Sequence, residues 1–131
     1  KMSEMLDRVV VNEGFEAKPY QDTLGIWTIG HGLTYLTSEE SRAIVASRLH
    51  DLGKQLIANK PWLEGYPTEV CEIVTEMCFQ MGPSRTYKFT KMFAALQQHD
   101  FREAAAQMRD SNWNKQTPER CERMAKRMEM A

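Results

Sequence analysis

The sequence predicts a mostly helical α+β fold, with a small β-hairpin lobe near the N-terminus, a long helix and a larger helical C-terminal lobe. Apolar residues recur at helical spacing in several segments of the 131-residue chain. Between residues 15 and 35, strand-favouring residues punctuated by glycines replace that pattern. The composition is 42% hydrophobic, which is enough to bury a core, and the length suits a single domain.

The N-terminal segment should form a helix followed by a β-hairpin. Ser3 is a good N-cap, and the helix should end at Gly14, which places Glu13 on its last turn. The strand-favouring residues that follow predict a hairpin or a three-stranded ribbon, with its turn near residues 23–25.

A long helix should connect the hairpin to the rest of the chain. Thr37, Ser38, Glu39 and Glu40 have the pattern of a capping box, which begins a helix over about residues 38–58. Lys60 and Pro61 should end this helix. Its buried stripe would consist of Ile44, Val45, Leu49, Leu52 and Leu56.

The remaining residues predict a set of shorter helices. Thr68 should cap a helix that ends at Gly82, and further helices should cover about residues 90–98 and 101–110. A last helix should begin with Pro118 in its first turn. The methionine pattern indicates core filling by Met77, Met81, Met108, Met124 and Met128.

Charge and cysteine content argue against several classes of protein. A net charge of −1 is too balanced for a nucleic-acid-binding protein, and no apolar run approaches the ~20 residues of a membrane span. Cys71 and Cys78 lie on one predicted helix, too far apart to form a disulfide, and the histidines are scattered. We therefore expect no metal site and no cofactor. The basic residues of 101–131 form either a surface for an anionic polymer or a solvated face.

Two carboxylates and a hydroxyl mark the strand-like region. Asp22 follows Glu13 by nine positions, and Thr28 follows Asp22 by six. Glycoside hydrolysis requires one protonated carboxyl group and one ionised carboxylate in contrasting environments. Glu13, at a helix C-terminus among apolar residues that should partly bury it, suits the proton donor. Asp22, in a polar turn, suits the base or water-orienting group, with Thr28 helping to hold the water.

Spacing alone leaves alternatives to this assignment open. The chain has 18 Asp and Glu residues, and Glu16, Glu39 and Glu40 satisfy nearly the same criteria. Histidine side chains in general titrate near neutrality, which makes His31 a second candidate acid or base, but it lies between two glycines without an obvious partner. We interpret His31 as a structural or exposed residue.

Three segments carry a resemblance to the phage-type lysozyme family. They are Glu13-x8-Asp22-x5-Thr28 with Gly30 and Gly32, then Phe79-Gln80-Met81-Gly82, then Trp113-Asn114-x-Gln116-Thr117-Pro118-x-Arg120. The likeness spans about residues 2–128 in one order. It implies a single lysozyme-like domain, 1–131. About residues 14–58 would form the β lobe and connecting helix, and about 59–131 with 1–13 would form the helical lobe.

The resemblance implies an inverting muramidase that cuts the β-1,4 bond between N-acetylmuramic acid and N-acetylglucosamine in peptidoglycan. Glu13, Asp22 and Thr28 match its catalytic positions, and Arg120 matches an arginine that pairs with and orients the catalytic glutamate. The substrate contacts would be Gly32, Phe79, Gln80 and Gln107, whereas Trp113 would pack in the core.

The family role implies lysis of a host bacterium. The N-terminus lacks the apolar segment of a signal peptide, so we expect synthesis in the host cytoplasm. Release through a holin would then bring the enzyme to the periplasm and the cell wall. We expect a monomer that does not bind nucleic acid and does not insert into a membrane.

The chain departs from the family pattern after Gly32. Only Leu33–Leu36 separate it from the capping box, where typical members carry a longer segment, and Leu33 replaces a frequent histidine. A shortened lobe should make fewer contacts with saccharides. Two alternatives stay open: a wall-binding or structural phage component without activity, and a lytic transglycosylase, against which the presence of Asp22 and Thr28 argues.

Overall fold

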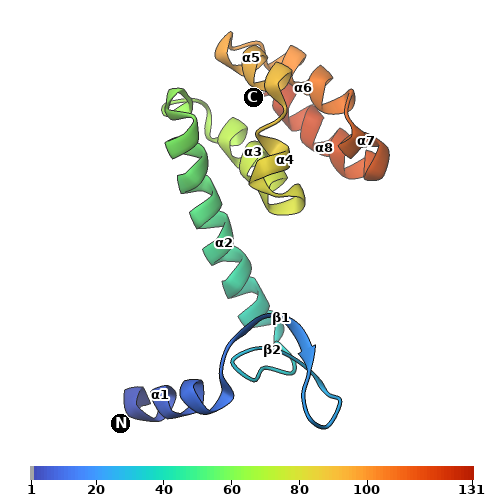
Figure 1. Ribbon diagram of the computed structural model, residues 1–131. Helices are drawn as coiled ribbons and strands as arrows, with labels where there is room; N and C mark the ends of the chain where they lie inside the picture. Colours follow the sequence, from blue (N-terminus) through green and yellow to red (C-terminus); the bar gives the residue numbers. More distant parts are fainter. Residues whose placement is uncertain (1) are drawn as a thin grey trace. The chain divides into compact units, whose positions relative to one another are not determined.

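The computed structural model describes residues 2–131, which form eight α-helices, a short 3-10 helix and one two-stranded antiparallel sheet (Figure 1). The elements in chain order are α1 Met2–Glu13, β1 Glu16–Gln21, β2 Trp27–Gly30, α2 Ser38–Asn59, η1 Pro61–Leu63, α3 Thr68–Met81, α4 Pro83–Thr86, α5 Thr90–Gln97, α6 Phe101–Arg109, α7 Asn112–Gln116 and α8 Pro118–Glu129. The predicted mostly helical α+β fold with a small N-terminal hairpin is confirmed.

The chain divides into two compact units, one up to Ile44 and one from Val45 to Ala131. The boundary therefore falls inside α2, and α1 groups with the hairpin. The expected boundary near residue 58, with residues 1–13 assigned to the helical lobe, stays a prediction.

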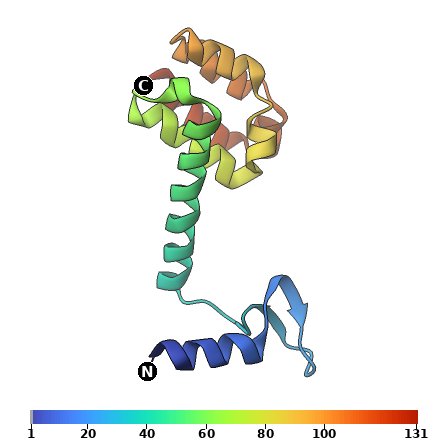
Figure 2. The same cartoon turned by 60° about the vertical axis from the view of Figure 1, so that its left-hand side comes forward.

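The first unit begins with α1, which leads directly into the hairpin (Figure 2). Because α1 already includes Met2, Ser3 lies inside the helix and the prediction that it caps the helix is wrong. Gly14 ends α1 as predicted: its N–H donates to the carbonyl of Val10 at 3.0 Å, and its φ of +70° is a conformation that glycine adopts without strain.

The hairpin has two strands and an irregular register. Tyr20 pairs with Thr28 and Gln21 with Trp27, but the register shifts between Tyr20 and Glu16. After β2, a single antiparallel bridge joins Ile29 to Leu33. Of the two predicted alternatives, a hairpin and a three-stranded ribbon, the described residues form the hairpin. Its turn lies between Gln21 and Trp27.

The capping box at the start of α2 is confirmed. The Thr37 N–H donates to Glu40 Oε1 at 2.9 Å, and the Glu40 N–H donates to Thr37 Oγ1 at 3.1 Å. The predicted buried stripe of α2 is partly wrong: Leu56 is fully buried, but Ile44 keeps 38% of its surface exposed. The periodic pattern therefore identified the helix but overstated how much of it is covered.

The second unit encloses the hydrophobic core. Helix α3 buries Val70, Ile73, Val74, Met77 and Cys78, and α5, α6 and α8 contribute buried residues to the same core. Four of the five methionines that were expected in the core are fully or almost fully buried, and Met81 is partly buried. The largest buried side chains include Leu56, Leu63, Ile73, Met77, Met92, Leu96, Met108 and Met128.

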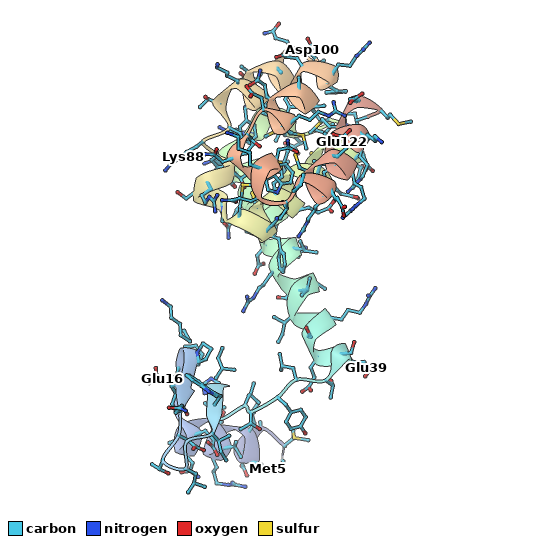
Figure 3. The ribbon with its side chains drawn as sticks, turned by 90° about the vertical axis from the view of Figure 1, so that its right-hand side faces the viewer. Met5, Glu16, Glu39, Lys88, Asp100 and Glu122 are labelled. Carbon is cyan, nitrogen blue, oxygen red and sulfur yellow. The ribbon has the colours of Figure 1, made fainter. Side chains whose placement is uncertain are left out.

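Helix ends in this unit show where the sequence-based prediction was incomplete. Thr68 is the first residue of α3 and its N-cap is Pro67, so the predicted Thr68 cap is wrong. Asp100, labelled in Figure 3, accepts from the Glu103 N–H at 3.0 Å and caps α6. The short helices α4 and α7 were not predicted.

Candidate active site

Asp22 is anchored by the turn that joins the two strands. Its Oδ1 accepts from the N–H of Leu24 at 2.8 Å and from the N–H of Ile26 at 2.9 Å. A backbone hydrogen bond closes the same turn, since the Asp22 N–H donates to the carbonyl of Ile26 at 2.9 Å. The Asp22 side chain is half-buried, and the two hydrogen bonds to Oδ1 fix the orientation of its carboxylate.

Thr28 is attached to the same turn. It lies on β2 with 5% of its surface exposed, and its hydroxyl donates to the carbonyl of Ile26 at 3.0 Å. The hydroxyl hydrogen is thereby used, so the oxygen offers its lone pairs as acceptors. Ile26 binds both Asp22 and Thr28, and the sequence carried no signal for this because the contacts are made by its backbone.

Glu13 is the last residue of α1, and its side chain lies against Gly32. A Cβ atom built on Gly32 would lie 2.6 Å from Cδ and 2.9 Å from Cγ of Glu13, and it would collide with the carboxylate oxygen Oε2. The partial burial predicted for Glu13 is wrong, since Glu13 is exposed and no residue of α1 is buried. Its position at the helix C-terminus holds as predicted.

His31 has the partner that the sequence did not reveal. Its Nδ1 lies 2.8 Å from the carbonyl oxygen of Gly14, and its ring lies 5.0 Å from the ring of Phe15, measured between centroids. The interpretation of His31 as an exposed residue holds, but the statement that it lacks a partner is corrected. The partner is far away in sequence, which is why spacing could not find it.

The other predicted site residues lie in the second unit. Phe79, on α3, is 40% exposed. Gln107, on α6, donates to Glu103 Oε1 at 2.8 Å, one turn earlier on the same helix. Arg120, on α8, is half-buried, and its pairing with Glu13 stays a prediction.

Gln80 is held in a structural network. Its Oε1 accepts from Trp113 Nε1 at 3.0 Å, and its Nε2 donates to Thr117 Oγ1 at 3.2 Å. Trp113 is 2% exposed, so the prediction that it packs in the core is confirmed. The network links the end of α3 to the start of α8, and one amide hydrogen of Gln80 stays available for a ligand.

Two arginines of the C-terminal helices are neutralised by glutamates of the same unit. Arg109 forms ion pairs with Glu122 and Glu129, and Arg127 forms ion pairs with Glu69 and Glu76 of α3. Hydrogen bonds from Arg109 lower the pKa of the Glu122 carboxyl group, which is labelled in Figure 3. These pairs involve only Arg109 and Arg127, and both interpretations of the basic residues of 101–131 stay predictions.

Within residues 2–131, no three His, Cys, Asp or Glu side chains come together in a way that could hold a metal ion. None of the helices in this range combines the length and the hydropathy that a bilayer span requires. Cys71, Cys78 and Cys121 are free thiols, and burial raises the pKa of each.

Comparisons with known proteins identify the family of the chain. The family model described as phage lysozyme matches residues 11–130. Two proteins of Dictyostelium discoideum, named probable T4-type lysozyme 1 and 2, are 27% and 23% identical to the chain, and each alignment covers 94% of the chain and 92% of the relative. The alignments extend over 157 and 156 residues, more than the chain contains, so both relatives carry residues with no counterpart here. The chain belongs to the phage lysozyme family and is a glycoside hydrolase of the lysozyme type, with peptidoglycan as its substrate.

Proposed function

We propose that this lysozyme is an inverting muramidase, with Glu13 as the general acid and Asp22 with Thr28 as the pair that orients the attacking water. The bond cleaved is the β-1,4 linkage between N-acetylmuramic acid and N-acetylglucosamine. Inversion needs a carboxyl group that protonates the leaving oxygen and a carboxylate that activates water on the opposite face of the sugar.

The observation that carries this proposal is the shared attachment of Asp22 and Thr28 to Ile26. Asp22 uses Oδ1 for the turn, so Oδ2 is the oxygen that would accept a hydrogen bond from water. Thr28 gives its hydrogen to Ile26 and would accept the second hydrogen of the same water. A water that donates to both groups directs its lone pair away from them, toward the anomeric carbon that it attacks.

Glu13 is proposed as the acid because it is the last residue of α1 and its side chain packs against Gly32. Gly32 lets the carboxyl group lie close to the backbone of the residues after β2, where a larger residue would displace it.

The glycan contacts of the proposal are Gly32, Phe79, Gln80 and Gln107, with Arg120 as the partner that orients Glu13. The 40% exposure of Phe79 and the remaining amide hydrogen of Gln80 support roles at a sugar surface. We propose that the enzyme acts as a monomer, is made in the host cytoplasm and reaches the wall through a holin.

The decisive experiment measures glycan cleavage in purified peptidoglycan sacculi by wild type, Glu13→Gln and the control Glu16→Gln. Glu16 begins β1 three positions later, is exposed and is labelled in Figure 3. We expect Glu13→Gln to lose ~10²–10⁴-fold in rate and Glu16→Gln to keep wild-type activity. Near-normal turnover by a folded Glu13→Gln would defeat the assignment.

The products distinguish the mechanism. Mass spectrometry should find reducing ends, and proton NMR of the first product should find the α anomer that inversion of a β linkage requires. Products ending in 1,6-anhydro sugars would instead identify a lytic transglycosylase.

A further inference from the structure

We propose that His31 is a positioning residue that holds Glu13 at the reaction site by fixing the end of α1. The proposal rests on the assignment of Glu13 as the general acid. It starts from the 2.8 Å contact between His31 Nδ1 and the carbonyl oxygen of Gly14, the residue that follows Glu13. The contact joins residues 17 positions apart in the sequence.

The chemistry of this contact sets the state of the ring. A carbonyl oxygen only accepts hydrogen bonds, so Nδ1 must carry the hydrogen. The neutral ring is therefore the Nδ1–H tautomer, and Nε2 is left as an acceptor. The same hydrogen bond persists when the ring is protonated, and the cation would then lie at the negative end of α1.

Two neighbouring attachments make this bond a positional restraint on Glu13. His31 binds Gly14, and the next residue, Gly32, lies against the Glu13 side chain. The residue pairs 13–14 and 31–32 therefore meet at two points, one a hydrogen bond and one a close packing contact. With only one of the two, α1 could pivot at Gly14, whose φ of +70° comes after the last helical residue.

Phe15 completes the restraint on the other side of the ring. Its ring lies 5.0 Å from that of His31 with an angle of 45° between the planes. Aromatic contacts of this kind contribute beyond the area that they bury. The imidazole is thus held by a hydrogen bond to Gly14 and by the ring of Phe15. Both partners directly follow Glu13 in the sequence.

The test separates the hydrogen bond from the ring contact. His31→Phe keeps a ring against Phe15 but cannot donate, whereas His31→Asn keeps an N–H near the place of Nδ1 and loses the ring. We expect His31→Phe to lower kcat on purified sacculi about tenfold with KM changed less than twofold, because the misplaced group acts in the chemical step. His31→Asn should recover kcat to within about threefold of wild type.

Controls keep the result independent of folding. His50→Phe changes an exposed histidine of α2 and should leave kcat and KM unchanged. Thermal unfolding of each variant shows that the protein is folded at the assay temperature. Wild-type kcat in His31→Phe would overturn the proposal, and so would a His31→Asn variant as slow as His31→Phe.

A measurement without turnover distinguishes this proposal from that of the function. Long-range nitrogen–proton NMR of the wild-type chain should show His31 as the Nδ1–H tautomer, and an Nε2–H tautomer would overturn the role of His31 while leaving Glu13 as the acid. Conversely, full activity of Glu13→Gln overturns the proposed acid, and with it the function of the restraint, even if the Nδ1–H tautomer is found.

Discussion

At the scale of single residues, the site is defined by backbone contacts around three side chains. Ile26 holds Asp22 and Thr28 through its peptide groups, and Gly32 gives Glu13 its place. Gly32 combines a φ of +74°, which L side chains rarely adopt, with the contact to Glu13. Substitution at Gly32 should therefore affect both stability and activity, and a suitable control can separate the two effects.

Gly32→Ala and Gly65→Ala provide that comparison. Gly65 has a φ of +85°, and a Cβ atom at this position would have nothing within 4 Å, so alanine there meets backbone strain alone. We expect each variant to lose about 1 kcal/mol in the free energy of unfolding. Only Gly32→Ala should lose activity, at least tenfold. The new Cβ atom should push the flexible Glu13 side chain aside, which costs little stability but removes the carboxyl group from its proposed catalytic position. Equal activity of the two variants would contradict the placement of Glu13.

Asp22→Asn tests the carboxylate without removing the turn. Asparagine keeps an oxygen that can accept from Leu24 and Ile26, so the free energy of unfolding should change little. Activity should fall ~10²–10⁴-fold because an amide cannot activate water. Asp51→Asn, on the exposed side of α2, is the matched control and should stay active. Full activity of Asp22→Asn would remove Asp22 from the mechanism.

At the scale of elements, the start of α2 depends on a reciprocal pair of hydrogen bonds. Thr37 and Glu40 satisfy each other's backbone N–H groups, and the bonds from Thr37 lower the pKa of the Glu40 carboxyl group. A lowered pKa in the folded state means that the ionised form stabilises the fold. The contribution is complete above the pKa of an unfolded glutamate, ~4.3, and is lost as the pH falls through the lowered value.

Glu40→Gln keeps an oxygen that can accept from the Thr37 N–H but removes the charge, so it should lower the free energy of unfolding at neutral pH. The difference between Glu40→Gln and wild type should shrink as the pH falls below ~4.3, because the wild-type carboxylate then becomes protonated and loses its charge as well. Urea unfolding at a series of pH values measures both effects. Ser38→Ala, at the first residue of α2, is a control that leaves both hydrogen bonds in place. A difference that stays constant down to a pH of about 2 would contradict the linkage.

At the scale of the whole molecule, the two Dictyostelium relatives contain residues with no counterpart in this chain, because their alignments extend over more positions than the chain has residues. In the first unit, the segment after β2 reaches α2 within a few residues, and several of its apolar side chains are exposed, among them Leu33, Tyr35 and Leu36. We expect the additional residues of longer family members to extend this segment, so that the lobe of this chain offers fewer groups to a saccharide.

We therefore expect a KM for purified sacculi several-fold higher than that of a family member with the longer segment, with kcat of the same order. Loss of contacts that bind the substrate and the transition state equally raises KM, whereas the residues proposed for the chemical step are all present in this chain. Initial rates over a range of sacculus concentrations measure both constants. A KM equal to that of the longer enzyme would show that the missing residues contribute nothing to binding.

The sequence by itself determined the class of fold and most of the helices, and it supplied the proposed residues of the site. Helical spacing, the capping box and the glycines at helix ends depend on local backbone physics, so they could be predicted, as α2 and the hairpin illustrate. The predicted caps at Ser3 and Thr68 failed because α1 already includes Met2 and α3 begins at Thr68 itself, so both residues lie within their helices.

Only the tertiary structure decided how the site residues are held. The contact of His31 with Gly14, the packing of Glu13 on Gly32 and the network of Gln80 with Trp113 join residues between 17 and 33 positions apart. Such contacts arise when the chain folds back on itself, and they leave no periodic signal in the residues between. The exposure of Glu13 was hidden for the same reason, because burial depends on which distant residues cover a side chain rather than on its apolar neighbours in sequence.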